Sequence, residues 1–221
     1  MNNLRENLEA VRERIARAAE GVGRDPATVV LLAVTKVFPA SVIREAYDLG
    51  LREFGENYVQ EFEGKAPEVG GLQGARFHLI GHLQSNKSSR AAELFQTIQT
   101  VDTVKLAKRL DSSGRALDVM IEVSLGGEEQ KSGADPGGLA ELVQAIRGCA
   151  NLRLRGLMTM PPWSEDPEAP RPIFRRLREL AQEHGLSELS MGMSHDLETA
   201  IDEGSTCVRV GTALFGKRKK V

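Results

Sequence analysis

The feature that most constrains the fold is an alternation, repeated eight times, between a short apolar run and a longer segment with helical periodicity. The first run, VVLLAVTK (29–36), contains six consecutive apolar residues. Such a run is typical of a strand buried on both faces of a parallel sheet, because burial of one face alone would produce alternation. The next segment, FPASVIREAYDLG (38–50), carries apolar residues at helical spacing and ends at a glycine. These two segments therefore predict one strand followed by one helix.

The same unit recurs along the rest of the chain. Seven further strands are predicted over residues 52–56, 76–81, 97–102, 117–124, 152–160, 188–192 and 206–211. Strict alternation of strands and helices implies parallel strands joined by right-handed crossovers. Eight units without a topological break favour a closed (β/α)8 TIM barrel, with an open doubly wound sheet as the alternative. Residues 4–18 repeat apolar side chains at spacings of three and four, which predicts an extra N-terminal helix before the barrel.

Composition restricts the class of protein. The chain has 221 residues, enough for one sizeable core, and no linker divides it, so we expect a single domain over residues 1–221. A formal net charge of −2 argues against a large phosphate-binding surface, and we expect no nucleic-acid partner. No segment approaches the roughly 18 apolar residues of a membrane span, and the charged N-terminal segment is unlike a signal peptide. We therefore expect a cytoplasmic protein with no membrane contact.

The cysteines and histidines give no metal or disulfide pattern. Cys149 and Cys207 lie far apart with no CxxC partner, which predicts two buried free thiols. His78 and His82 are four residues apart, but the interval crosses a strand end, so no metal site is predicted.

Polar and small residues collect at the carboxyl ends of the predicted strands, where TIM barrels place their chemistry. Lys36 ends the first strand, while SMGMS (190–194) and RVGT (209–212) end the seventh and eighth. Loops at these last two positions commonly bind phosphate, since glycines let backbone N–H groups approach it. A lysine opposite a phosphate site is consistent with a lysine-imine aldolase or a pyridoxal 5′-phosphate (PLP) protein. Arg209 favours PLP, because its guanidinium could donate to the pyridine nitrogen.

Six segments resemble, in order and spacing, the YggS/PROSC family of PLP homeostasis proteins. They are AVTK (33–36), FGENYVQE (54–61), FHLIGHLQSNK (77–87), EEQKSG (128–133), RGLMTMPP (155–162) and SMGMSHDLETAIDEGSTCVRVGTALFG (190–216). The resemblance covers nearly the whole chain. It implies a fold similar to the N-terminal domain of alanine racemase, and a role in keeping PLP available without a robust catalytic activity.

The resemblance also implies a role for particular residues. By it, Lys36 forms the Schiff base and Arg209 contacts the pyridine nitrogen. Phosphate contacts are implied for Ser194, Gly211 and Thr212, and Asn57 is implied as a neighbour of the cofactor. The implied partners are PLP itself and the enzymes that use or synthesise it. The chain departs from the family pattern at Ser124, where asparagine is more frequent, and has a titratable ring at the variable position 195.

A weak PLP-dependent racemase is the alternative function, and an aldolase without cofactor is a more distant one. Racemisation needs an acid/base group on each face of the substrate carbon, and Lys36 can serve only one face. Alanine racemase supplies the second group from another domain of a partner subunit, and we expect no such domain here. The only tyrosines, Tyr47 and Tyr58, are expected to pack against the barrel. We therefore expect a monomeric carrier of PLP.

Overall fold

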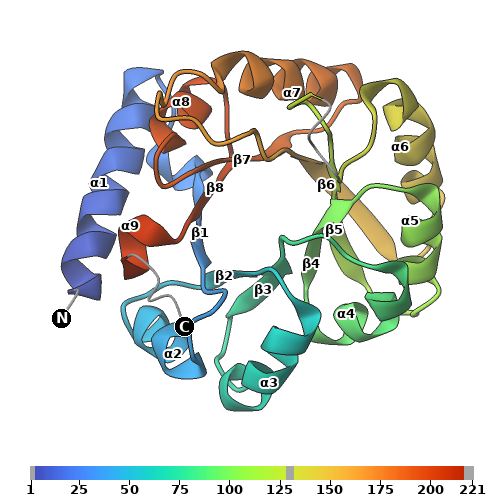
Figure 1. Cartoon of the computed structure of the whole chain (residues 1–221), viewed down its shortest axis with the longest axis horizontal. Coiled ribbons are helices and arrows are strands. Elements are labelled where there is room, and N and C mark those ends of the chain that lie inside the picture. Colours follow the sequence, from blue (N-terminus) through green and yellow to red (C-terminus); the bar gives the residue numbers. More distant parts are fainter. Residues whose placement is uncertain (1–2, 128–131, 217–221) are drawn as a thin grey trace.

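The computed structural model describes residues 3–127 and 132–216 and contains a closed barrel of eight parallel strands in sequential order (Figure 1). The strands are β1 (Val30–Val34), β2 (Glu53–Glu56), β3 (Arg76–Leu79), β4 (Thr97–Val101), β5 (Leu117–Glu122), β6 (Leu152–Met158), β7 (Glu188–Met193) and β8 (Cys207–Val210). Strand β1 pairs with β8 in parallel register, with Val30 opposite Cys207 and Ala33 opposite Val210. This pairing confirms the predicted TIM barrel and excludes the open sheet, in which the two edge strands would remain apart.

Helices surround the barrel and connect successive strands (Figure 1). They are α1 (Leu4–Gly21), α2 (Ala40–Asp48), α3 (Val59–Val69), α4 (Ser88–Leu94), α5 (Val104–Asp111), α6 (Leu139–Arg147), α7 (Arg171–Glu183), α8 (Leu197–Asp202) and α9 (Thr212–Phe215). Short 3-10 turns cover Pro26–Thr28, Ser85–Lys87 and Pro136–Gly138. The last of these directly precedes α6. Residues 128–131 of the EEQKSG motif and the basic residues 217–220 lie outside the described residues.

Helix α1 supports the segments that follow the last two strands. It packs against α8 and α9 outside the barrel (Figure 1). Nδ2 of Asn7 donates a hydrogen bond to the carbonyl of Leu214 at 2.8 Å, and Nη1 of Arg14 donates to the carbonyl of Ser194 at 3.0 Å. The extra N-terminal helix therefore holds the two loops in which phosphate contacts are expected.

The interior of the barrel is more polar than the layer between the strands and the helices. That outer layer is apolar, whereas a separate and much smaller apolar cluster is formed by Leu32, Val34, Ile80 and Cys207. Polar side chains make up much of the remaining interior, and they are at most 8% exposed: His78, Gln99, Glu122, Ser190 and Arg209. Since buried polar groups need partners, this interior must be organised by hydrogen bonds.

The two cysteines have different surroundings. Cys207 is buried, as predicted, and burial raises the pKa of its thiol to about 11. The prediction is wrong for Cys149, which is only half-buried because it follows α6 at the outside of the barrel. Its thiol lies 3.3 Å from the carbonyl oxygen of Ala145. Neither cysteine is in a disulfide. Within residues 3–127 and 132–216, no helix combines the length and apolarity needed to cross a membrane.

Candidate functional site

A cavity of about 270 Å³ opens at the carboxyl ends of the strands. All six residues singled out from the sequence line it: Lys36, Asn57, Ser194, Arg209, Gly211 and Thr212. They come from the ends of β1, β2, β7 and β8, which are neighbours in the closed barrel. Barrel closure therefore joins residues from both ends of the chain in one cavity.

The backbone turns sharply directly after Lys36. Strand β1 ends at Val34, and Val37 has a φ of 64°. This left-handed conformation is costly for a β-branched residue, so other contacts must hold it. One contact is the hydrogen bond from the Val37 N–H to Oε1 of Glu61, at 2.5 Å. The turn leaves Val37 exposed while the preceding Lys36 lines the cavity.

A buried ionic cluster lies between the end of β1 and helix α3. Nζ of Lys65 donates to Oε1 of Glu61 at 2.6 Å, to both carboxyl oxygens of Glu56 at 3.0 and 3.1 Å, and to the Thr35 carbonyl at 3.1 Å. The Thr35 hydroxyl donates to Oε1 of Glu56 at 2.7 Å. Burial raises the pKa of Glu56, and the charge of Lys65 opposes that shift. The cluster thus holds the backbone on both sides of Lys36.

Arg209 is fixed in the wall of the cavity. Its Nη1 donates to the Ser190 hydroxyl and its Nη2 to the Thr159 carbonyl, both at 2.8 Å. Burial lowers the pKa of Arg209, but a guanidinium keeps its proton even when buried. The cavity therefore contains a permanent, oriented cation.

A line of hydrogen bonds continues from Arg209 through the barrel. The Ser190 hydroxyl donates to Oε1 of Gln99 at 2.7 Å, and Nε2 of Gln99 lies 3.1 Å from Nδ1 of His78. Nε2 of His78 lies 2.5 Å from Oε2 of Glu53. Because a carboxylate only accepts, Nε2 of His78 carries the hydrogen, and its Nδ1 accepts from Gln99. Each group in this line thus donates its hydrogen bond to the next group farther from the cavity.

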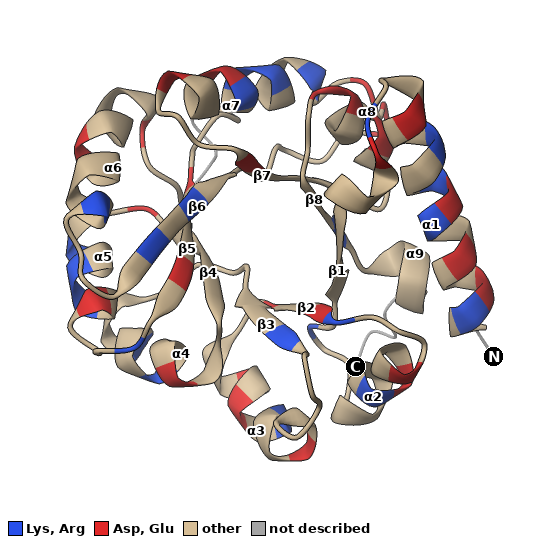
Figure 2. Cartoon of the chain, turned by 180° about the vertical axis from the view of Figure 1, so that it is seen from behind, with Lys and Arg blue, Asp and Glu red and all other residues tan. Residues whose placement is uncertain are grey.

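The line ends at the opposite mouth of the barrel. There, Glu53, His78 and Gln99 line a separate cavity of about 480 Å³. Charged segments lie on β2, β3, β5 and β6 around this opening, as Figure 2 shows. Arg76 pairs there with Asp118 at 2.7 Å. The carboxylates and cations at this mouth of the barrel are largely paired with one another.

The loops after β7 and β8 meet at Ser194. Its hydroxyl oxygen accepts hydrogen bonds from the N–H groups of Gly211 at 3.3 Å and Ala213 at 3.2 Å. The approach depends on Gly192, whose φ is 90° and where a Cβ would lie 2.4 Å from Cβ of Ala200. Backbone donors therefore point at an oxygen atom in the region where a phosphate is expected.

A loop between β6 and α7 forms one side of the cavity. Trp163 lines the cavity and is 73% exposed. Nε2 of His195 lies 2.8 Å from the Glu165 carbonyl, and the Thr199 hydroxyl donates to Oε1 of Glu168 at 2.9 Å. His195 is exposed, and its contact attaches this loop to the segment before α8.

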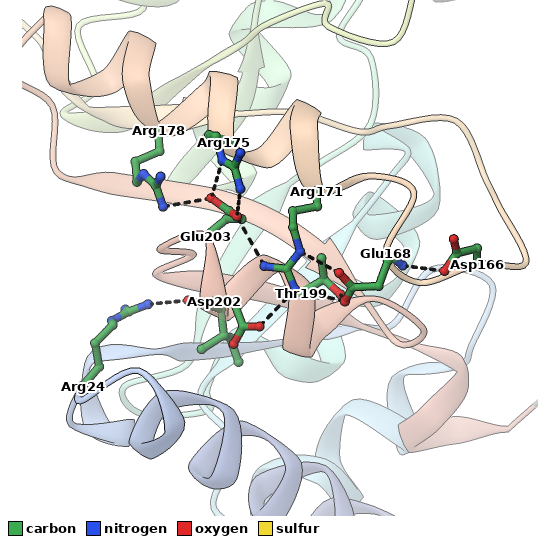
Figure 3. Close-up of polar contacts among 10 residues, drawn as sticks. Arg24, Asp166, Glu168, Arg171, Arg175, Arg178, Thr199, Asp202 and Glu203 are labelled. Atoms are coloured by element: carbon green, nitrogen blue, oxygen red, sulfur yellow. Dashed lines mark hydrogen bonds and ion pairs between the residues drawn. The ribbon is translucent and has the colours of Figure 1, made fainter.

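An arginine cluster joins α7 to the end of α8. Arg171, Arg175 and Arg178 point toward the buried carboxylate of Glu203, at 3.3, 3.0 and 2.9 Å (Figure 3). Burial alone would raise the pKa of Glu203, but the three arginines lower it. Since α8 directly follows the SMGMS segment, this cluster fixes the base of the loop that carries Ser194.

The structure places the two histidines singled out from the sequence at opposite mouths of the barrel. His78 lines the cavity at the amino ends of the strands, whereas His82 lies at the carboxyl ends.

Tyr47 is half-buried, with its hydroxyl donating to the Gln73 carbonyl at 2.8 Å. The expectation that Tyr58 packs against the barrel is wrong, because its side chain is 59% exposed at the start of α3. The described residues contain no group of three or more His, Cys, Asp or Glu placed to hold a metal.

Sequence reasoning missed the residues that orient Arg209. Ser190 belongs to the SMGMS motif, but only Ser194 was assigned a role. Ser190 begins the motif that Ser194 ends, and its place in that motif at the end of a predicted strand was the available signal. No local signal identified Gln99, because its partners come from other strands.

Comparisons with known proteins agree with this geometry. The family model described as alanine racemase, N-terminal domain, matches residues 2–219. A protein of Pseudomonas aeruginosa named pyridoxal phosphate homeostasis protein is 49% identical over 99% of this chain and 97% of its own length. The structure of PipY from Synechococcus elongatus with PLP bound has a TM-score of 0.86 at 37% identity, covering 97% of this chain and all of PipY. Alanine racemase of Clostridium difficile shares the fold alone, with a TM-score of 0.75 at 14% identity over 100% of this chain and 58% of its own.

Proposed function

Since this chain belongs to the alanine racemase N-terminal domain family, and within it to the pyridoxal phosphate homeostasis proteins, we propose that it binds PLP on Lys36 and takes part in intracellular PLP homeostasis. The observation that carries the proposal is one cavity lined by a lysine, a fixed arginine and a group of backbone donors. These three features match the aldehyde, the pyridine nitrogen and the phosphate of PLP. PipY, similar over nearly the whole chain, has been solved with PLP bound.

The donors around the cavity fit this cofactor. The N–H groups of Gly211 and Ala213 point at the Ser194 hydroxyl oxygen, so they are already arranged around an oxygen acceptor. The hydroxyls of Ser194 and Thr212 add donors for a phosphate. The Asn57 side chain also lines the cavity, and its buried Oδ1 has no hydrogen-bond partner among the described residues. That oxygen is suited to accept a hydrogen bond from a ligand.

When bound, PLP supplies an aldehyde that condenses with a primary amine and a pyridine ring that withdraws electrons. Lys36 supplies the amine, and the cluster around Lys65 holds the turn that directs it. Arg209 would face the pyridine nitrogen of the bound cofactor and, as a permanent cation, would disfavour protonation of that nitrogen. An unprotonated ring withdraws electrons less strongly, so such a site would favour holding the cofactor over activating a substrate on it.

We expect the chain to act as a monomeric carrier that exchanges PLP with enzymes that make or use it. Weak racemisation would need a second acid/base group opposite Lys36. Tyr58 lines a neighbouring cavity but is largely exposed, and no contact fixes its hydroxyl within the described part of the chain. An exposed and unfixed phenol is poorly suited to be a general base.

The test compares three forms of the full chain: wild type, Lys36→Ala, and Lys105→Ala, which removes an exposed lysine on α5. Added PLP should produce the visible absorbance of a lysine imine in the wild type and in Lys105→Ala, and none in Lys36→Ala. Absence of that absorbance in the wild type would overturn the proposal.

Catalysis is then measured on the loaded protein as exchange of the α-protons of L- and D-amino acids in heavy water. We expect no exchange above that of free PLP. Exchange at enzyme-like rates that disappears in Lys36→Ala would instead identify an amino-acid racemase.

A further inference from the structure

A second cavity, of about 440 Å³, adjoins the proposed PLP site. The two cavities share Asn57, Ile80 and Met160 as lining residues, so a ligand in one lies beside a ligand in the other. The second cavity extends over the carboxyl ends of β3 and β5, away from the phosphate loops. The proposed function gives it no role.

The second cavity contains two buried acceptors without donors. Only three buried side-chain atoms lack a hydrogen-bond partner among the described residues, and two of them are Asn57 Oδ1 and Glu122 Oε2. Glu122 is 1% exposed, and its other oxygen accepts from the Ser132 hydroxyl at 3.0 Å. Because buried acceptors normally have a donor, two such atoms in one cavity point to a ligand that donates hydrogen bonds.

The charges around Glu122 also leave room for a cation. Burial raises the pKa of Glu122, and the nearby Asp102 adds to that rise, while Arg209 and His82 oppose it. Neither of these two side chains forms an ion pair with Glu122 in the described part of the chain. The Nη atoms of Arg209 donate to Ser190 and Thr159, and Nδ1 of His82 lies 3.7 Å from Asp102. A buried carboxylate with no ion pair among the described residues would be stabilised by a cation in direct contact.

We propose that this cavity binds the protonated amino group of a small amine, with Glu122 and Asn57 as its acceptors, and that the negative charge of Glu122 repels carboxylates. An ammonium group provides both the positive charge and the N–H donors that these two residues lack. A carboxylate provides neither, and it would bring like charges together in a poorly hydrated site. The position of the amine beside PLP rests on the proposed function, whereas its binding to the cavity does not.

This selectivity has a consequence for the proposed carrier. Simple amines reach the neighbourhood of Lys36 more readily than α-amino acids, whose carboxylate is repelled by Glu122. Amino acids are the substrates of most PLP chemistry, so their exclusion would protect the bound cofactor from reaction.

The test uses three probes of similar size on the full chain: protonated trimethylamine, tetramethylammonium and isobutyrate. Trimethylamine is tertiary and cannot form an imine, so its binding reports the cavity alone. Calorimetric titration is carried out with and without PLP. We expect protonated trimethylamine to bind, tetramethylammonium to bind more weakly because it has no N–H, and isobutyrate not to bind.

Glu122→Gln keeps the shape of the side chain and its acceptor for Ser132 but removes the charge. Loss of a charge-assisted hydrogen bond should weaken trimethylamine binding by about tenfold or more. The matched control is Glu165→Gln, which removes one negative charge from an exposed residue on the same side of the barrel that lines neither cavity. This control should bind trimethylamine as the wild type does.

Equal trimethylamine affinity in Glu122→Gln and the wild type would overturn the inference, as would isobutyrate binding as tightly as trimethylamine. If Glu122→Gln does not fold, the order of the three probes on the wild type decides. The two proposals fail separately: missing imine absorbance refutes PLP binding, while normal absorbance with no amine selectivity refutes only the inference.

Discussion

Replacing Lys65 by methionine should destabilise the fold by about 3–5 kcal/mol, because it leaves a buried carboxylate without its cation. Lys65 is 8% exposed, Glu56 is fully buried, and their closest atoms are 3.0 Å apart. After the change, the Thr35 hydroxyl is the one donor to Glu56 that remains among the described residues. The Thr35 carbonyl and Glu61 also lose their contacts with Lys65, each beside the turn that follows Lys36.

Urea unfolding at neutral pH measures the loss as a lower midpoint, and a double-mutant cycle identifies its source. Glu56→Gln removes the buried carboxylate charge that has lost its cation. The double variant Lys65→Met/Glu56→Gln should therefore recover a large part of the stability lost in Lys65→Met. The control is Lys105→Met on the exposed face of α5, which should change stability by no more than about 0.5 kcal/mol.

The penalty should also depend on pH. Burial raises the pKa of Glu56 and Lys65 opposes the rise, so removing Lys65 raises that pKa further. A group with a raised folded-state pKa stabilises the fold fully below its unfolded pKa, and this contribution is lost as pH rises through the folded pKa. The deficit of Lys65→Met should therefore be larger at pH 7 than near pH 5. A deficit below about 1 kcal/mol, or strictly additive single variants, would refute this reasoning.

Three further predictions concern other parts of the barrel. Burial raises the pKa of Cys207 to about 11 from 9.0, so relative to Cys207→Ala the wild type should lose about 3 kcal/mol between pH 9 and 11, as followed by urea unfolding. Gly192→Ala places a Cβ 2.4 Å from Cβ of Ala200 at a φ of 90°, so it should cost about 1–3 kcal/mol and weaken PLP binding measured by absorbance, whereas Gly21→Ala has open space and should not. Glu203→Gln should lower the thermal midpoint at neutral pH; because the arginines depress the pKa of Glu203 against the effect of burial, the difference from wild type should shrink as pH falls below 4.

The fold was predictable because its signal is local and repeated. Each strand is an apolar run and each helix an amphipathic segment, so eight repeats determine the layout without knowledge of any contact. The gathering of Lys36, Ser194 and Arg209 was predictable for a related reason, because the carboxyl ends of parallel strands share one face of a barrel.

The surroundings of these residues could not be predicted in this way. Lys65 lies in an amphipathic helix, where a lysine ordinarily faces solvent, and only the position of Glu56 on the adjoining strand explains its burial. Glu122 is a charged residue within an apolar strand, yet its unpaired oxygen is a property of the assembled cavity. Val37 has the left-handed backbone conformation that is usual for glycine or asparagine, so its residue type gave no sign of that conformation.

The line of hydrogen bonds from Arg209 to Glu53 makes the two mouths of the barrel dependent on one another. At its centre, the Gln99 amide accepts from the Ser190 hydroxyl through its oxygen and donates to Nδ1 of His78 through its nitrogen. Ser190 in turn accepts from Arg209. The orientation of Arg209 at one mouth of the barrel therefore depends on side chains that line the other mouth.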